Sequence, residues 1–235
     1  MSAPSVWAAT EAELTRAAGR ALELTTGAGV IGLGSGRAAT AFIHALGAQV
    51  RGGRAARGVP TSEATAQLAR KLGIPLAGLD EVSPEVTVDG ADEVDPQLDL
   101  IKGWGGALVR ERIVAAASRQ QIILVGPEKL VLVLGARGRL PVEVVPFALP
   151  LARRRLELLV GAPTVRIAAD GRPFVTDNGN AILDCAVEPI AEPQGLEREI
   201  LAIPGVVGSG LFLATADIVL VGGPDGVREL RRARV

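Results

Sequence analysis

The 235-residue sequence is poor in the side chains on which several classes of chemistry depend. It contains one cysteine, one histidine and no tyrosine, and only 3% of its residues are aromatic. One cysteine excludes an intramolecular disulfide and a thiolate metal cluster. The one histidine, His44, lies in an expected amphipathic helix (TAFIHALGAQV), so a histidine triad and a multi-histidine metal site are excluded as well. The chemistry of this chain therefore depends on carboxylates, lysines and backbone groups.

Long apolar runs and a strong excess of one charge are also missing. The N-terminus MSAPSVWAATEAEL has no basic start followed by an apolar block, and no apolar run reaches membrane-spanning length. We therefore expect a cytoplasmic protein with no membrane partner. The formal net charge is −1, so a nucleic-acid partner is not expected either. Arg153–Arg155 and the Arg-rich C-terminus are interpreted as solvated helix faces.

The remaining composition is that of a globular protein. Apolar residues make up 48% of the chain and charged residues 22%, which excludes a disordered chain. A length of 235 residues is enough for one large domain, or for one large and one small domain. Cys185 lies in the apolar run ILDCAV and is interpreted as a small core residue rather than as a nucleophile.

Short apolar strands alternate with helices in the first half of the chain. Helices are expected over 9–24, 38–48, 61–73 and 106–118, the first with Thr10 as N-cap and Glu13 as its capping-box partner. Strands are expected in GVIGLG, IPLAGL, EVTVDG and QQIILVG. This alternation predicts an α/β fold with a Rossmann-like, mostly parallel sheet that has helices on both faces.

The pattern changes near Pro141. A strand (PVEVVPFA) and a helix (PLARRRLELLVG) are followed by a β-rich stretch with the turn signals DG and NGN, and then by a helix (LEREILAIPG). The last expected strand, ADIVLVGG, rejoins the first sheet. We therefore predict an α/β catalytic domain over 1–135 and 207–235, interrupted by a smaller α+β (ferredoxin-like) domain over 136–206.

The segment GLGSGRAA joins an expected strand to an expected helix. Gly34, Gly36 and Ala39 satisfy the dinucleotide-binding pattern, but the acid expected about 20 residues later is replaced by the basic run RGGRAARGVPTS. A glycine loop at a helix N-terminus still offers N–H groups to an anion, and Ser35 and Arg37 add a hydroxyl and a charge. A phosphorylated small molecule explains this loop better than a nicotinamide cofactor, and a purely structural turn is the remaining alternative.

The stretch VDGADEVDPQLDLIKGWGGALVRE runs from Val88 to Glu111 and begins with crowded acids. Asp89 and Asp92 follow an expected strand, at the end of a parallel sheet where ligands bind. Asp-Gly is also an ordinary turn sequence, so a structural role stays open for the acids. That alternative does not explain KGWGG, where glycines permit close backbone approach beside Lys102.

This stretch closely resembles the signature segment of ribose-5-phosphate isomerase, type A. GLGSG, VPTSEATAQLARKLGIPL, LPVEVVPFA, VTDNGNAILD and IPGVVGSGLF resemble further blocks of that family, in the family's order. The resemblance implies interconversion of ribose 5-phosphate and ribulose 5-phosphate through an enediolate, without cofactor or metal. We expect a homodimer or homotetramer.

The resemblance also assigns roles. It makes Glu111 the general base, with Lys102, Asp89 and Asp92 as further catalytic residues. A cation near the enediolate oxygen suits Lys102 and Lys129. The residues implied to contact the substrate are Gly34, Ser35, Gly36, Arg37, Ala38, Asp89, Gly90, Ala91, Asp92, Lys102, Gly103, Trp104, Gly105 and Lys129.

The sequence departs from the family's pattern at three places. The family's Gly-Ser-Thr is here Gly36, Arg37 and Ala38, and Trp104 stands where glycine is common. A phosphate-contacting lysine of the first helix is replaced by Thr15, with Arg16 beside it. Arg37 either binds the phosphate in place of the missing hydroxyls or points into solvent.

Two other functions remain as alternatives. A sugar-phosphate sensor would share this architecture, but no helix-turn-helix with basic recognition residues precedes the glycine loop. An acyl-CoA transferase of related fold would use a glutamate as a nucleophile rather than as a base. Formation of a ketose from ribose 5-phosphate distinguishes the isomerase from both.

Overall fold

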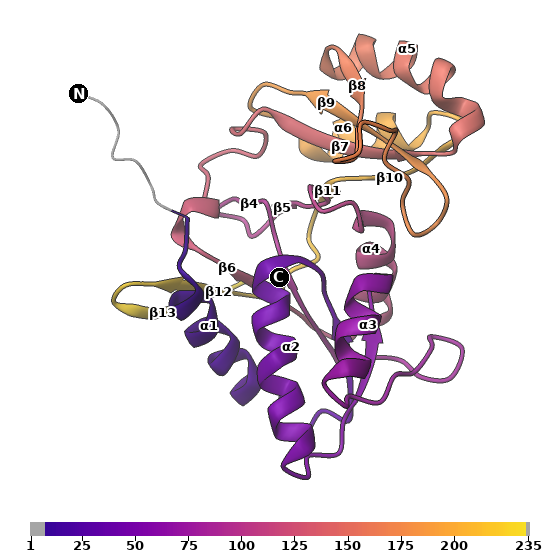
Figure 1. The fold of residues 1–235 in the computed structure, drawn as a ribbon. Coiled ribbons are helices and arrows are strands. Elements are labelled where there is room, and N and C mark those ends of the chain that lie inside the picture. Colours follow the sequence, from indigo (N-terminus) through magenta and orange to yellow (C-terminus); the bar gives the residue numbers. More distant parts are fainter. Residues whose placement is uncertain (1–7, 234–235) are drawn as a thin grey trace. The chain divides into compact units, whose positions relative to one another are not determined.

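The computed structural model describes residues 8–233, which form two compact units (Figure 1). Within this range, unit 1 consists of residues 8–91, 113–130 and 215–233, and unit 2 of residues 92–112 and 131–214. Unit 2 thus contains the expected inserted domain together with flanking segments, chiefly 92–112. The N-terminal residues examined for a targeting signal include 1–7, which lie outside the described residues.

Unit 1 is built on a six-stranded sheet with the order β13-β12-β6-β3-β1-β2. All neighbouring strands are parallel except β12 and β13. The strands are β1 (Val30–Leu33), β2 (Arg57–Pro60), β3 (Val86–Gly90), β6 (Gln121–Val125), β12 (Ile218–Gly223) and β13 (Gly226–Arg231). Every residue of β6 is buried, as expected for a central strand covered on both faces.

Helices cover both faces of this sheet. On one face, alternate strand residues such as Ile31, Val88 and Ile122 pack with α1 and α2 in one apolar core. On the opposite face, Val59 packs with Val114 of α4. The helices are α1 (Glu11–Leu24), α2 (Gly36–Arg51), α3 (Glu63–Lys71) and α4 (Leu108–Ala117). The predicted fold class is therefore confirmed.

The first helix begins where its sequence predicts. The Thr10 side chain accepts from the Glu13 N–H, and the Glu13 carboxylate accepts from the Thr10 N–H at 2.7 Å, which completes the predicted capping box. The buried face of α1 consists of Leu14, Ala17, Ala18, Ala21 and Leu22. Small side chains on this face allow close packing on α2.

Unit 2 contains a four-stranded antiparallel sheet with the order β10-β7-β9-β8. Its strands are β7 (Arg139–Val144), β8 (Pro163–Val165), β9 (Ala181–Ala186) and β10 (Val206–Ser209). Helix α5 (Leu149–Val160) follows β7, and α6 (Pro193–Leu201) follows β9. The element order βαββαβ with this strand order is the ferredoxin-like arrangement, as the sequence predicts.

A second, three-stranded antiparallel sheet belongs to unit 2 and has the order β11-β5-β4. It consists of β4 (Glu93–Val94), β5 (Leu100–Ile101) and β11 (Leu211–Phe212). Two single turns of 3₁₀ helix complete the described elements: η1 (Pro127–Lys129) in unit 1 and η2 (Pro146–Ala148) in unit 2. The short hairpin of β4 and β5 carries the predicted site residues Asp92 and Lys102 at its open end, before β4 and after β5.

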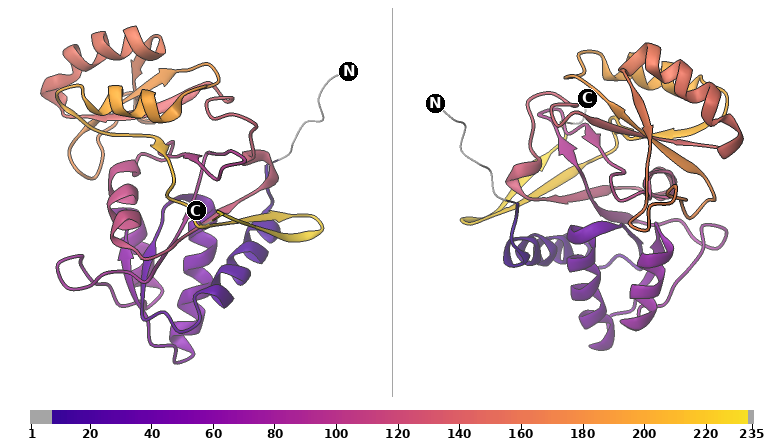
Figure 2. Two further views of the ribbon diagram at one scale, coloured as in Figure 1. Left: turned by 180° about the vertical axis from the view of Figure 1, so that it is seen from behind. Right: turned by 45° about the horizontal axis from the view of Figure 1, so that its top comes forward.

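Three local predictions are wrong. IPLAGL does not form a strand: only Leu76 makes an isolated bridge, to Gly58. Pro75 removes one N–H donor from this segment, which hinders a regular ladder. ADIVLVGG is not the last strand, because β13 returns antiparallel to β12 and forms the edge of the sheet (Figure 2). The C-terminal arginines Arg228 and Arg231 therefore lie on a strand rather than a helix, whereas Arg153–Arg155 are exposed on α5 as expected.

None of the helices in residues 8–233 combines the length and apolar character that crossing a membrane requires.

Candidate active site

The predicted site residues fall into two sets, one in each unit. Unit 1 holds the glycine loop Gly34–Ala38, the strand end Asp89–Ala91, and Lys129. Unit 2 holds Asp92, the loop Lys102–Gly105, and Glu111.

In unit 1 the glycine loop is bonded to the end of the neighbouring strand. Asp89 is fully buried, and its Oδ1 accepts from the N–H groups of Ser35 at 3.1 Å and Gly90 at 2.7 Å. A Cβ at Gly34 would lie 2.2 Å from Asp89 Oδ1 and 2.6 Å from Asp89 Cα. Only glycine at position 34 allows this approach, so the glycine loop is packed directly against Asp89 and hydrogen-bonded to it.

A cluster of hydroxyl groups surrounds Ser35. Its Oγ lies 2.9 Å from Thr61 Oγ1, 2.8 Å from Ser62 Oγ and 3.2 Å from Thr65 Oγ1. Thr65 Oγ1 also donates to the Gly34 carbonyl at 2.9 Å. Sequence analysis did not select Thr61, Ser62 or Thr65 as site residues. The available signal was TSEAT at the end of β2, since neighbouring parallel strands end at the same edge of a sheet.

Arg37, in the first turn of α2, is paired with an acid of α1. Its Nη2 lies 2.9 Å from Glu11 Oε1 and donates to the Ala9 carbonyl at 3.1 Å, and the side chain is 60% exposed. Thr15 donates to the Glu11 carbonyl, and Arg16 to the Gly223 carbonyl. Arg37 and Arg16, the two cations at positions where the sequence departs from the family pattern, thus both contact other groups of the protein.

Lys129 ends η1, directly after the central strand β6. Its N–H donates to the Gly126 carbonyl at 3.1 Å, and its side chain is half-buried. This places the lysine at the carboxyl end of β6, the edge where the sequence predicts it.

In unit 2 the β4–β5 hairpin brings Asp92 and Lys102 to its open end. Glu93 pairs with Ile101 in the antiparallel ladder, and the Asp92 N–H donates to the Ile101 carbonyl at 2.8 Å. Asp92 Oδ2 then accepts from the Trp104 N–H at 2.9 Å. The aspartate therefore fixes the backbone of the glycine loop that follows Lys102.

Lys102 and Glu111 form a buried ion pair. Lys102 Nζ lies 3.2 Å from Glu111 Oε2, and the two side chains are 3% and 7% exposed. Lys102 Nζ also lies 5.5 Å from the centre of the Phe212 ring. Glu111 stands in the first turn of α4. A carboxylate and an ammonium group held together away from water are suited to moving a proton and to neutralising the charge that the transfer creates.

The loop between Lys102 and α4 is held by a residue that sequence analysis missed. Arg166 Nη1 donates to the Gly103 carbonyl at 3.0 Å and to the Trp104 carbonyl at 3.1 Å. Gly103 adopts φ +99°, and a Cβ at that position would lie 2.8 Å from Leu108 Cβ. The loop conformation thus requires glycine and is fixed from outside by a guanidinium group.

Arg166 is in turn held by Asp184 of β9. Asp184 accepts from Arg166 Nε at 2.9 Å and from Arg139 Nε at 2.9 Å, and its side chain is 15% exposed. Burial opposes ionisation of Asp184, but the hydrogen bonds from Arg166 and Arg139 outweigh it, so the pKa of this carboxyl lies below its ordinary value.

We expect Asp184→Asn to destabilise the protein at neutral pH but not in acid. A carboxylate with a lowered folded-state pKa stabilises the fold above its unfolded pKa, near 3.8, and loses that effect as the pH falls through the folded value. Breaking such a pair costs on the order of 3 kcal/mol. Urea unfolding from pH 7 down to the lowest pH at which both proteins fold measures this difference. If the loss of unfolding free energy in Asp184→Asn stayed the same at every pH, the Asp184 charge would not be the source of the stabilisation.

Cys185, next to Asp184, is 1% exposed, which confirms its interpretation as a core residue. Burial, with a smaller effect of the Asp184 charge, raises the pKa of its thiol to about 12. Among the described residues, no group of three or more His, Cys, Asp or Glu side chains is arranged to hold a metal ion.

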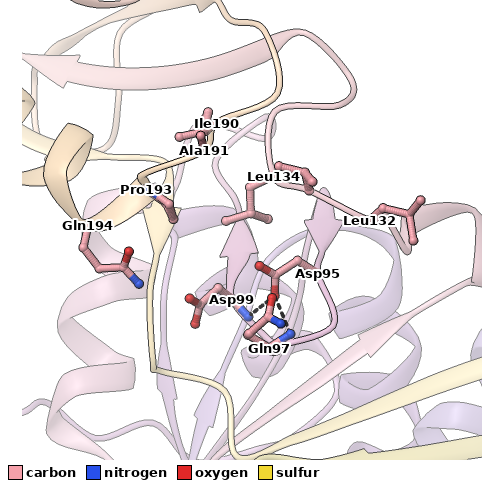
Figure 3. Close-up of a pocket in the computed structure, with 10 residues that line it drawn as sticks. Asp95, Gln97, Asp99, Leu132, Leu134, Ile190, Ala191, Pro193 and Gln194 are labelled. Atoms are coloured by element: carbon pink, nitrogen blue, oxygen red, sulfur yellow. Dashed lines mark hydrogen bonds between the residues drawn. The ribbon is translucent and has the colours of Figure 1, made fainter.

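Unit 2 also contains a cavity of about 320 Å³ (Figure 3). Asp95 Oδ1 accepts from the N–H groups of Gln97 and Asp99, which shapes the turn on one side of it. The lining residues are Asp95, Gln97, Asp99, Leu132, Val133, Leu134, Ile190, Ala191, Pro193 and Gln194. None of the predicted site residues lines this cavity.

The chain is similar to known proteins over most of its length. The sequence model of the family ribose 5-phosphate isomerase A (phosphoriboisomerase A) matches residues 57–226. The ribose-5-phosphate isomerase A of Roseiflexus sp. (strain RS-1) is 52% identical over 218 residues, which cover 92% of this chain and 94% of the relative. That of Thermomicrobium roseum is 48% identical and covers 96% of each chain.

Solved structures agree as well. A D-ribose-5-phosphate isomerase in complex with phospho-erythronic acid is 40% identical, with a TM-score of 0.91 over 95% of this chain and 100% of that one. Ribose 5-phosphate isomerase A from Methanocaldococcus jannaschii is 39% identical, with a TM-score of 0.90 over 95% of this chain and 100% of that one.

The fold and these matches define an enzyme of the aldose–ketose isomerase class. The chain belongs to the ribose 5-phosphate isomerase A family. The resemblance stated from the sequence, and the enzyme class that it implies, are confirmed.

Proposed function

We propose that this chain interconverts ribose 5-phosphate and ribulose 5-phosphate through an enediolate, with Glu111 as the base that carries the proton. The observation on which the proposal depends is the buried pair of Lys102 and Glu111, 3.2 Å apart. Among the candidate groups, this pair combines a proton acceptor with a cation in a site from which water is largely excluded.

The reaction needs one proton to move between two neighbouring carbons. Glu111 removes the C2 proton of the open-chain aldose, and the electron pair of that C–H bond forms the enediolate as negative charge develops on O1. Lys102 stabilises this charge. Glu111 then returns the proton to C1, while the proton of the O2 hydroxyl is transferred to O1 and C2 becomes the carbonyl. The atoms balance without a co-reactant.

The other predicted residues are proposed to bind the substrate. In unit 1, the loop Gly34–Ala38 is assigned to the phosphate, since N–H groups, a hydroxyl and a cation suit a dianion. Lys129 keeps its predicted role as a cation for the enediolate charge. Asp89, Gly90 and Ala91 are assigned to sugar hydroxyls. In unit 2, Asp92 and the loop Gly103–Gly105 are given the same role. Asp89 and Asp92 are also proposed to assist opening of the furanose ring.

The test of the function is incubation of the purified chain with ribose 5-phosphate, with ketose formation as the readout. A panel of other pentose and hexose phosphates defines the substrate range, and a chelated sample tests the expected independence of metal. Stabilisation by sugar phosphates without turnover would favour the sensor. Acyl exchange with an acyl-CoA would favour the transferase.

We expect Arg37→Ala to raise KM for ribose 5-phosphate if Arg37 leaves Glu11 to bind the phosphate. A lost charged hydrogen bond corresponds to about 1.5–3 kcal/mol, or roughly ten- to a hundredfold in KM. Turnover of free ribose should change little, and Arg37→Ser with Ala38→Thr should recover much of the loss. Glu11→Gln is the matched control, because it removes the charged partner of Arg37 and keeps the arginine. An unchanged KM in Arg37→Ala would limit this side chain to its contacts with Glu11 and the Ala9 carbonyl.

The proposal includes a cytoplasmic homodimer or homotetramer. Unit 2 exposes large apolar side chains, among them Phe147 at 97%, Leu132 at 87% and Leu158 at 81%. Where such side chains gather into a contiguous patch, they mark a surface that associates. Light scattering of the purified protein measures the assembly, and a monomeric mass at micromolar concentration would overturn this part of the proposal.

A further inference from the structure

Strand β7 carries a glutamate that the reaction scheme above does not use. Glu143 is fully buried in a strand of otherwise mostly apolar side chains. Its Oε1 accepts from Thr176 Oγ1 at 3.0 Å, from Asn178 Nδ2 at 3.1 Å and from Asn180 Nδ2 at 2.9 Å. A buried carboxylate is costly unless its hydrogen bonds compensate it. Here three donors of the TDNGN turn, residues 176–180, provide that compensation, so the turn is fixed on the sheet.

The same turn contacts the helix that carries Glu111. Asn178 Oδ1 accepts from Arg110 Nε at 2.9 Å, while Nδ2 of the same amide donates to Glu143. The Asn178 side chain therefore links Glu143 to Arg110. Arg110 Nη2 also donates to the Asp177 carbonyl at 2.9 Å. Two donors of one planar guanidinium thereby contact neighbouring groups of the turn, which restricts its orientation as well as its distance.

Arg110 directly precedes Glu111 in the first turns of α4. Successive residues of an α-helix are about 100° apart around its axis, so a rotation of this turn that displaces Arg110 displaces Glu111 by the same angle. Arg112, on the other side of Glu111, donates to the Ser209 carbonyl at 3.1 Å and lies 3.1 Å from Glu197 Oε1. The backbone that presents Glu111 is therefore held from both sides by other parts of unit 2.

We propose that Glu143 and Asn178 are positioning residues for the isomerisation: through Arg110 they set the rotation of the first turn of α4 and so keep Glu111 against Lys102. The inference rests on the proposed role of Glu111. Neither residue needs to touch the substrate. A displacement of about 1 Å at a reacting group can lower a rate by on the order of a hundredfold, so a loosened turn affects chemistry before it affects the fold.

The chain offers a matched pair of variants for the test. Asn178→Ala and Asn180→Ala each remove one amide donor from Glu143 Oε1, but only Asn178 also contacts Arg110. We expect Asn178→Ala to lower kcat by roughly tenfold or more with KM nearly unchanged, and Asn180→Ala to leave kcat within about twofold, at similar melting temperatures. Because Arg110→Ala interrupts the same connection, the double variant of Asn178 and Arg110 should be no slower than the slower single variant.

The outcomes separate this inference from the proposed function. If Glu111→Gln is inactive while Asn178→Ala and Asn180→Ala have equal kcat, the positioning role is overturned and the function stands. If Glu111→Gln keeps its activity, the role of Glu111 fails and the inference fails with it. Independent, multiplicative losses in the Asn178 and Arg110 variants would show that Asn178 does not act through Arg110. A change in KM alone would make these residues substrate-binding groups and would also overturn the inference.

Discussion

Replacing Glu111 by glutamine is expected to remove nearly all turnover while the protein still folds and binds substrate. Glutamine keeps the size of the side chain but cannot accept the C2 proton. Loss of a general base typically lowers the rate by about 10²–10⁴-fold, and more where no substitute is near. Steady-state kinetics measures turnover of ribose 5-phosphate, and calorimetric titration of the variant with ribose 5-phosphate measures its binding. A variant that keeps half of the wild-type kcat would remove Glu111 from the mechanism.

The burial of the pair requires a stability control for this variant. Glu111→Gln leaves Lys102 buried without its carboxylate, and breaking a buried ion pair can cost about 3–5 kcal/mol. The double variant Glu111→Gln with Lys102→Met contains no buried charge at either position, so it should regain stability but not activity. Glu199→Gln, on the exposed surface of α6, controls for the loss of one carboxylate elsewhere in unit 2.

Lys102→Met is expected to lower kcat much more than it lowers substrate affinity. The negative charge that Lys102 stabilises is fully developed only in the enediolate, so its contribution is made in the transition state. Loss of one such electrostatic contact typically costs about 10²–10³-fold in kcat. Methionine keeps an unbranched side chain of similar length while removing the ammonium group and its approach to the Phe212 ring. If KM rose and kcat did not change, Lys102 would be a ground-state binder and its assigned role would be wrong.

Sequence alone predicted the elements whose signals are local. The capping box of Thr10 and Glu13 needs four neighbouring residues, and it is present as predicted. The apolar runs of β6 and β12 identified central strands because such runs rarely occur elsewhere. The strand β13 was missed because GVRELR is polar and half-exposed. An edge strand with one free side carries few apolar residues, so its pairing depends on the PDG turn before it rather than on its composition.

The site was predictable where one continuous motif holds it. Asp92, Lys102 and Glu111 all come from the segment 88–111, and the structure brings them into one small part of unit 2. Their catalytic roles stay predictions. The partners of the supporting groups were not predictable, because Arg166, Glu143 and the hydroxyls of residues 61–65 reach them only through the tertiary fold. Besides TSEAT at residues 61–65, a second signal was overlooked: a glutamate inside the apolar strand LPVEVV is almost never buried without dedicated partners.

The burial of Cys185 has a practical consequence for experiments on this chain. Because burial raises the pKa of this thiol, at pH 8 it is far less ionised than an ordinary exposed cysteine, and only the thiolate reacts with maleimides. The native sequence can therefore serve as a nearly unreactive background for covalent dyes and spin labels. A cysteine introduced at Arg154, on the exposed face of α5, would become the single point of attachment without first mutating the core.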